Sequence, residues 1–423
     1  MSSFFSKLGL VLKDSVMRKR IIFTVVALVL FRFLATIPVP GVDVFQLERL
    51  LSGSQLFGFL NIFSGGGLSN LSIVMLGVGP YITASIIMQL GTMMVPRLKE
   101  IYREEGEAGR ARFSQYSRIA SVPLALIQSY GFLALLQSQN VLAPMAGLDL
   151  IVNVVLVATG SVLLMWIGEL ITEFGIGNGT SLIIFAGIVS VIPSRFIELV
   201  AGFTPALITV YAGLIVASVL VIIGVVAATE AERAIPVTYA KQSRGGNVYG
   251  GADTYIPFRL NQAGVIPIIF ALSILVFPQM LVNILSKTSA PFLADFAFTV
   301  QNALTNPYIY GSIYFVLVVL LTFFYTSVTF EPVQIAEDLQ KRGAFIPGVR
   351  PGEHTVHYLS TIVTRITLIG ALFLGIVAVL PVVIQAITGN STFAIGGTAL
   401  LIVVSVVLDL IKKVDAQAAM REY

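Results

Sequence analysis

Stretches of about 20 apolar residues with few or no charges recur along the whole 423-residue chain. A helix of roughly 20 residues crosses the roughly 30 Å hydrocarbon core of a bilayer, and it satisfies its own backbone hydrogen bonds in lipid. Only 11% of the residues are charged and 56% are hydrophobic, which is typical of an integral membrane protein. No strand-like alternation of apolar and polar residues is present, so a β-barrel is not expected.

The apolar runs predict ten membrane-spanning helices, and an even number places both termini on one side. The first run follows a basic stretch and resembles a signal peptide, but it ends in Pro-Val-Pro-Gly without a small-residue cleavage site, so we interpret it as a retained span. The spans are predicted at Ile21–Ile37, Ile73–Val95, Ile119–Gln137, Leu150–Ile171, Thr180–Ile197, Ala206–Ala228, Ala263–Leu285, Ile309–Phe330, Ile366–Ile387 and Gly396–Ile411.

The distribution of basic residues predicts which side faces the cytoplasm. Of the 26 lysines and arginines, 22 fall in the two terminal tails and in the loops on the same side as the tails. Cytoplasmic loops of membrane proteins carry such an excess. We therefore expect both termini to be cytoplasmic, and we attribute the basic excess to topology rather than to nucleic-acid binding.

Two loops on this side, 229–261 and 331–365, are too long to be simple connectors. Long loops in compact proteins are usually functional or disordered. Proline, glycine, tyrosine and phenylalanine are scattered through both, unlike low-complexity polar sequence. We expect ordered docking elements.

The sequence lacks the residues that most enzymes need. It contains no HExxH, GxSxG or phosphate-binding loop motif and no cysteine. The two histidines, His354 and His357, have no neighbouring ligand set, so a surface role is favoured over metal binding. We expect no catalytic residues, no cofactor and no metal.

Charged residues are almost absent from the interiors of the spans. Arg32, Glu169, Arg195 and Asp409 all fall near span ends, where snorkelling or interfacial pairing accounts for them. Ion-coupled transporters need a titratable group near the midplane, so a solute transporter with inverted repeats is disfavoured but stays the alternative. A scaffold without a pore is a third possibility.

Spans 2 and 7 carry glycine, proline and uncharged polar residues instead of charges. Proline within a span frees a backbone carbonyl, which is tolerated where protein or a cavity satisfies it. Helices that line or gate a passage fit this pattern, and ordinary packing of small residues fits either span alone.

Six dispersed stretches together resemble the SecY family of protein-translocation channels. They occur in family order over essentially the whole chain, and the ten-span pattern and long inner loops agree with the family. The stretches are IPVPGVD (37–43), NIFSGGGLSN (61–70), GVGPYITASIIMQL (77–90), WIGELITEFGIGNGTSLIIFAGI (166–188), NQAGVIPIIFA (261–271) and FIPGVRPGE (345–353).

The resemblance implies an all-α polytopic fold with ten transmembrane helices in two pseudo-symmetric five-helix halves around a central pore. The implied parts are a tail at 1–20, a first half at 21–197 with spans 1–5, a second half at 206–411 with spans 6–10 and both docking loops, and a tail at 412–423. The halves open sideways between spans 2–3 and 7–8. An unfolded polypeptide passes through the middle, and apolar helices leave through the side.

By the same resemblance, a ring of aliphatic side chains narrows the pore. Val78 and Ile82 are four residues apart and share one helical face. Thr180 departs from the usual aliphatic residue, which predicts a slightly wetter ring. The ring positions are Val78, Ile82, Thr180, Ile184, Ile269 and Ile402.

The segment NIFSGGGLSN follows apolar residues, and its helical part, about Leu56–Phe63, is roughly 12 Å long, too short to cross a bilayer. From the residues alone it is either an interfacial helix or a movable stopper. The resemblance implies that it is the plug of the pore, at about 56–72. Its apolar face consists of Leu60, Ile62 and Phe63, and its flexible hinge of Gly65, Gly66 and Gly67.

The resemblance also places the polar residues of the lateral gate at Thr83, Gln89 and Asn261. Hydrogen bonds between helices at these residues are expected to close the gate, and an entering signal sequence is expected to replace those bonds.

For the two long loops, the resemblance implies docking of partners. Arg350 lies between two prolines that present its guanidinium rigidly. Near the tip of the other loop Gly246 and Asn247 replace a common basic pair, and nearby Lys241 and Arg244 are expected to compensate.

The resemblance also implies the setting. The expected function is that of a passive channel that moves unfolded secretory polypeptides across, and releases transmembrane segments into, the bacterial cytoplasmic membrane. The expected partners are a SecE-like and a SecG-like small membrane subunit, the SecA motor ATPase, the ribosome, signal-sequence-bearing polypeptides and the lipid bilayer.

Overall fold

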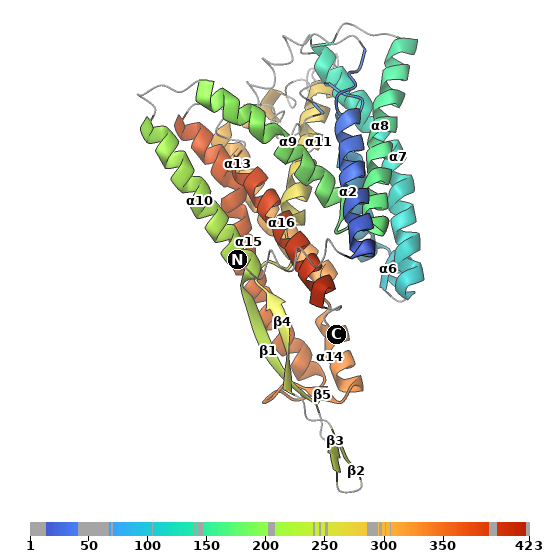
Figure 1. Ribbon diagram of the computed structural model, residues 1–423, viewed down its shortest axis with the longest axis vertical. Coiled ribbons are helices and arrows are strands. Elements are labelled where there is room, and N and C mark those ends of the chain that lie inside the picture. The colour runs from blue at the N-terminus through green and yellow to red at the C-terminus, as the bar shows by residue number, and fades with distance from the viewer. Residues whose placement is uncertain are drawn as a thin grey trace.

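The computed structural model describes residues 14–40, 67–68, 71–103, 105–138, 141–142, 147–201, 208–239, 242–244, 247–249, 253–285, 295, 298–300, 302–304, 306–388 and 396–419. Long helices run side by side through most of the molecule, and a β-hairpin projects from one end (Figure 1). Four helical stretches in these ranges, 106–137, 148–174, 307–341 and 353–386, are both long and apolar enough to cross a membrane on their own.

Each of the ten predicted spans corresponds to a helix. Two short amphipathic helices, α6 (Pro96–Arg103) and α14 (Pro332–Lys341), lie between spans. The long helices are α2 (Ser15–Leu34), α5 (Gly79–Met94), α7 (Gly106–Ser138), α8 (Leu148–Phe174), α9 (Gly179–Ala201), α10 (Ile208–Glu230), α11 (Ile266–Leu285), α13 (Pro307–Thr329), α15 (Glu353–Thr388) and α16 (Gly396–Ala419).

Several boundaries differ from the prediction because hydropathy locates the membrane and not the ends of helices. Residues 71–78 form turns, and α5 begins only at Gly79, after Gly77 adopts a positive φ of 58° and before Pro80 fixes the first helical turn. The helix α15 begins at Glu353, well before the predicted start of span 9, and so continues far outside the apolar segment.

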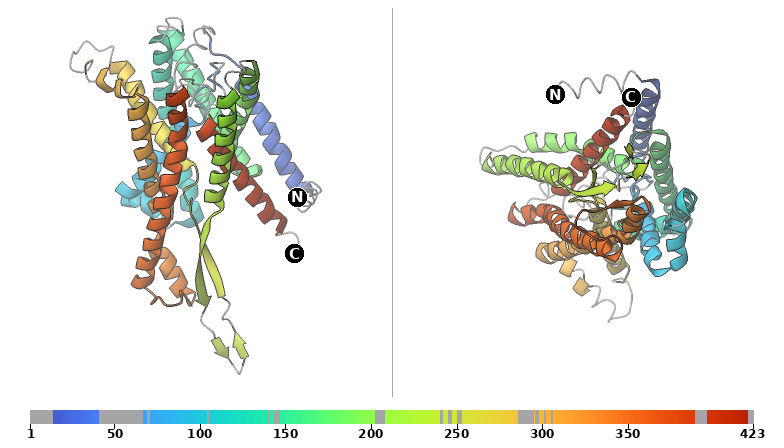
Figure 2. Two further views of the ribbon diagram at one scale, coloured as in Figure 1. Left: turned by 90° about the vertical axis from the view of Figure 1, so that its left-hand side faces the viewer. Right: turned by 90° about the horizontal axis from the view of Figure 1, so that it is seen from below.

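The loop 229–261 contains strands that the sequence reading did not predict. Strands β1 (Glu232–Tyr239) and β4 (Asp253–Arg259) form an antiparallel hairpin in which Ile235 pairs with Ile256. The short strand β5 (Ala344–Phe345) from the other long loop joins this sheet in the order β4-β1-β5. Strands β2 (Gln242–Arg244) and β3 (Asn247–Tyr249) form a separate pair at the far tip (Figure 2).

The sheet is attached to the first turns of α15 by its own apolar cluster. Ile235 and Phe258 from the hairpin are buried with Leu359 and Ile362 of α15, and Ile335 and Leu339 of α14 pack against them. Burying apolar surface is the main driving force for such packing. The two long loops therefore form one structured platform on α15.

The two chain ends of the helical bundle lie on the side that carries this platform. Met17 at the start of α2 is buried with Ile176, and Leu410 and Val414 near the end of α16 pack against them. The lower ends of α2 and α16 in Figure 1 are also on the side of the hairpin. This arrangement agrees with an even number of spans.

Candidate functional site

Five aliphatic residues predicted to form a ring belong to or pack against one large apolar cluster inside the bundle. Val78, Ile82, Ile184 and Ile402 are buried, with exposed fractions of 0%, 8%, 1% and 2%, and the half-buried Ile269 packs against the same cluster. Val78 lies just before α5, Ile82 is in α5 and Ile184 is in α9, so these three belong to the first predicted half. Ile269 in α11 and Ile402 in α16 belong to the second half.

Thr180, the sixth predicted ring position, is half-buried in the first turn of α9. Its hydroxyl oxygen lies 3.4 Å from the position that a Cβ of Gly168 would occupy, so Thr180 packs beside α8. Gly179 is also held close to α8, since its amide donates to the Thr172 hydroxyl at 2.9 Å. Placement of Thr180 in the ring stays a prediction.

The backbone just before α5 is fixed by α8. A Cβ on Gly160 would lie only 2.1 Å from the carbonyl oxygen of Ile73, so α8 touches this backbone directly. The neighbouring Ser161 hydroxyl donates a buried 2.8 Å hydrogen bond to the carbonyl of Gly77. Because Val78 follows Gly77, this contact sets the position of one of the predicted ring residues.

Most of the predicted plug, including Leu60, Ile62, Phe63, Gly65 and Gly66, lies outside the described residues. At its described end, the Ser72 amide donates to the Gly67 carbonyl at 2.8 Å. Leu68 and Leu71 are fully buried in a second apolar cluster with Phe132 of α7. This end of the segment is therefore anchored in the first half of the chain.

The helices of the predicted lateral gate are in contact, since α11 packs against α5, α7 and α13. The Thr83 hydroxyl donates to the Gly79 carbonyl at 3.0 Å and accepts a long 3.5 Å bond from the Gln128 side chain of α7. The buried side-chain oxygens of Gln89 and Asn261 have no partner in the part of the chain that the structure describes. The hydrogen bonds expected across the gate are thus not made by these oxygens here.

The segment that leads into α11 is held against α15. A Cβ on Gly370 would meet the Leu260 carbonyl oxygen at 2.5 Å and the Asn261 Cα at 3.9 Å. Gly370 therefore allows the close approach that positions Asn261 in the segment just before α11, one of the helices of the predicted lateral gate.

The predicted docking residues are only partly described. Lys241 lies outside the described residues, and for Arg244 only the backbone, in β2, is placed. Arg350 is exposed and lines a pocket of 590 Å³ between β1, its own loop and the first turns of α15. Its carbonyl accepts a 2.9 Å hydrogen bond from the Thr355 hydroxyl, which fixes the loop to the helix.

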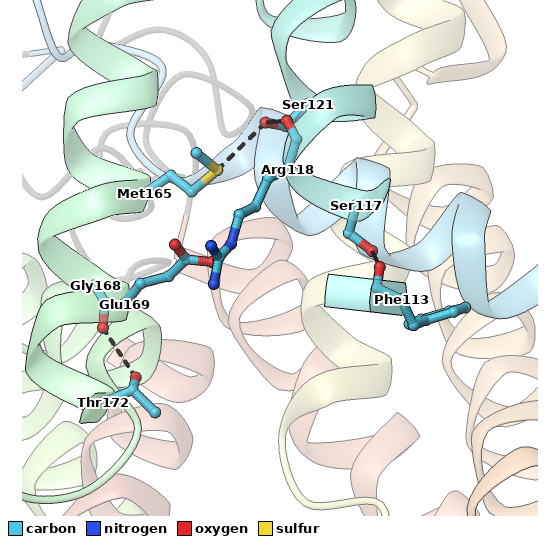
Figure 3. Close-up of polar contacts among 8 residues, drawn as sticks. All are labelled: Phe113, Ser117, Arg118, Ser121, Met165, Gly168, Glu169 and Thr172. Carbon is cyan, nitrogen blue, oxygen red and sulfur yellow. Dashed lines mark hydrogen bonds and ion pairs between the residues drawn. The ribbon is translucent and has the colours of Figure 1, made fainter. Parts of the chain in front are cut away.

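An ion pair between α7 and α8 was not predicted from the sequence. The guanidinium of Arg118 donates to the carboxylate of Glu169 (Figure 3). One turn along, the Ser121 hydroxyl lies 3.3 Å from the Met165 sulfur. The position of Glu169 near a span end was the available signal, but only the packing of α8 on α7 identifies its partner.

In the described part of the chain, ten long apolar helices pack on shared apolar clusters and carry a structured platform at one end, which is the architecture of a polytopic membrane protein. The sequence profile of the SecY family matches residues 72–411. The chain is 39% identical to the protein translocase subunit SecY of Mycobacterium bovis over 96% of each chain, and 40% identical to that of Corynebacterium glutamicum over 97% of each. This chain belongs to the SecY family.

Solved structures agree with this assignment. A protein-conducting channel superposes with a TM-score of 0.66 at 18% identity, covering 97% of this chain and 94% of the other. Sec61 in a canine ribosome–channel complex superposes with a TM-score of 0.62, also at 18% identity and with the same coverage. These superpositions support the fold, and membership of the SecY family makes the chain a non-enzymatic protein-conducting channel subunit rather than a solute transporter.

Proposed function

We propose that this channel works in the bacterial cytoplasmic membrane with both termini in the cytoplasm. Unfolded secretory polypeptides pass through the ring of Val78, Ile82, Ile184, Ile269 and Ile402, and transmembrane segments leave between α5–α7 and α11–α13. The observation that supports the proposal is that these five side chains, which come from both halves of the chain, all belong to or pack against the large apolar cluster inside the bundle.

The chemistry of the ring suits this task. A short apolar constriction resists wetting, so it impedes ions while no chain is present. The five aliphatic side chains also give a moving polypeptide no hydrogen-bonding or charged group, and Thr180, the sixth predicted position, would add a single hydroxyl. The plug at about 56–72 is proposed to seat on this ring, and its buried anchor at Leu68 and Leu71 supports attachment to the first half.

The proposed partners are a SecE-like and a SecG-like subunit, the SecA motor and the ribosome. The similar Mycobacterium protein is a translocase subunit, and a structurally similar channel was solved in a ribosome complex. The exposed guanidinium of Arg350, on a loop fixed to α15, is a suitable group for bidentate pairing with a carboxylate or a phosphate.

Reconstituted vesicles test the proposal. Vesicles that contain the chain and its SecE-like subunit are expected to protect a secretory precursor from external protease when SecA and ATP are added. Arg350→Glu is expected to lower this import strongly, while Arg342→Glu, at an exposed position outside the pocket, serves as the matched control.

Two outcomes would count against the proposal. If the wild-type vesicles protect no precursor, the conducting role under these conditions is wrong. If Arg350→Glu and Arg342→Glu import equally, Arg350 is not a docking residue.

A further inference from the structure

The pocket that contains Arg350 is unusually basic. Three arginines and two histidines line it, and Val349 and Ile362 form apolar parts of its wall. No aspartate or glutamate is among the residues that line it. The basic residues are Arg233, Arg350, His354, His357 and Arg365.

The three guanidinium groups have no carboxylate partner among the residues that the structure describes. Elsewhere on the same side basic side chains are paired, as in Lys412 with Glu230 at 2.8 Å and Lys341 with Glu337 at 3.3 Å. Arg233, Arg350 and Arg365 form no ion pair within the described part of the chain. Concentrated positive charge in a concave site favours an anionic ligand, and guanidinium groups bind phosphate well.

One face of α15 connects this pocket to the membrane region. His354, Tyr358, Thr361 and Arg365 follow each other at helical spacings of three or four residues and share a face. The same spacing continues through Ile369, Leu372 and Ile376, which are 57%, 41% and 60% exposed. Up to Arg365, this face of α15 is basic and lines the pocket. Beyond Arg365, the same face is apolar and exposed.

The position of this change matches a membrane surface. The apolar part of α15 begins at Ile366, and Arg233 follows closely after Glu230, the last residue of the membrane-spanning α10. Arg365 and Arg233 are therefore at the depth of lipid headgroups, where anionic lipids attract basic residues. Arg350 is further out, since about 18 Å of helix separates Glu353 from Arg365.

We propose that the membrane end of this pocket binds an anionic phospholipid of the cytoplasmic leaflet. Arg365 and Arg233 hold its phosphate, and its acyl chains lie along Ile369, Leu372 and Ile376. Arg350 stays available at the outer end, so a lipid and a soluble partner occupy different parts of one basic groove. This proposal for a lipid site is independent of the proposed transport function.

Lipid titration of the purified full-length chain tests this site. Native mass spectrometry counts bound phosphatidylglycerol or phosphatidylcholine per chain at increasing lipid concentration. The wild type is expected to prefer phosphatidylglycerol. Arg365→Gln is expected to weaken that lipid about fivefold and Arg233→Gln by a similar factor, since each guanidinium near the surface contributes on that scale.

Two controls make the result specific. Arg342→Gln removes an exposed arginine outside the pocket and is expected to leave phosphatidylglycerol binding unchanged. Arg365→Lys retains the charge and is expected to keep most of the affinity. If Arg365→Gln lowers the melting temperature, Arg233→Gln on the adjacent strand provides an independent measurement.

Three results would overturn the proposal. Equal weakening by Arg342→Gln would mean that only net charge matters. Soluble glycerol phosphate that binds as tightly as phosphatidylglycerol would mean that the acyl chains contribute nothing and the site serves a soluble anion. Unchanged lipid binding in both Arg365→Gln and Arg233→Gln would assign the pocket to a soluble partner alone.

Discussion

The contact of α8 with the backbone before α5 makes Gly160→Ala the most informative substitution. The new Cβ would be 2.1 Å from the Ile73 carbonyl oxygen and 2.8 Å from its carbon. A normal contact needs more than 3 Å, so one of the two backbones must move by roughly 1 Å. Ile73 is five residues before Val78, and the adjacent Ser161 holds the Gly77 carbonyl, so the shift reaches the ring.

The magnitude follows from overpacking. Forcing one extra carbon into a packed interior costs about 1–3 kcal/mol, and the higher helix propensity of alanine offsets about 1 kcal/mol of that. If Val78 belongs to the proposed ring, its displacement also loosens the apolar seal that prevents wetting. We therefore expect Gly160→Ala to lower the unfolding free energy by up to about 2 kcal/mol and to raise resting ion leak.

Gly213→Ala is the matched control. Gly213 is in α10, is exposed, and would have no atom within 4 Å of an added Cβ. Thermal unfolding in detergent reports stability, and ion flux from vesicles without precursor reports the seal. If Gly160→Ala matches Gly213→Ala in both measurements, then the α8 contact does not position the ring and the reasoning fails.

Three further substitutions test other contacts. Ile402→Asn places an amide in the buried cluster and is expected to raise ion leak and relax signal-sequence selectivity; unchanged leak and selectivity would remove it from the ring. Glu169→Gln leaves the half-exposed Arg118 unpaired and is expected to cost about 1 kcal/mol in unfolding experiments, whereas a double-mutant cycle without coupling would show that the pair contributes nothing. Gly370→Ala should push the Leu260 carbonyl away and change the accessibility of a cysteine introduced at position 261, and unaltered labelling would contradict this.

The membrane-spanning part of the fold was predictable because the bilayer imposes one length and one composition on every span. All ten helices occur where the apolar runs predicted them. Their ends were not predictable in the same way. The helix α15 begins at Glu353 because Leu359 and Ile362 pack under the β-hairpin, and this tertiary contact leaves no mark in the hydropathy of residues 353–365.

In the candidate site, too, the features set by local spacing were predictable from the sequence, whereas those set by packing between helices were not. Val78 and Ile82 share a face by spacing alone, but their burial in one apolar cluster with Ile402 requires packing between distant helices, and only the family resemblance predicted that the three belong together. The pairing of Arg118 with Glu169 depends on which helices are neighbours, so the residues alone do not reveal it. The basic face of α15 would have been visible in the sequence if its helix had been extended to His354, since the spacing to Arg365 is helical.

The length of α15 has a mechanical consequence. Between Glu353 and Pro381 it is an uninterrupted rod of about 42 Å whose outer third is clamped to the hairpin by buried side chains. A partner that pushes on the hairpin would therefore also push on the outer end of α15. A tilt of α15 by about 5° over that length moves its far end by about 4 Å. Force applied in the aqueous phase thus reaches α11 and α13, which both touch this rod, without any change in its own hydrogen bonds.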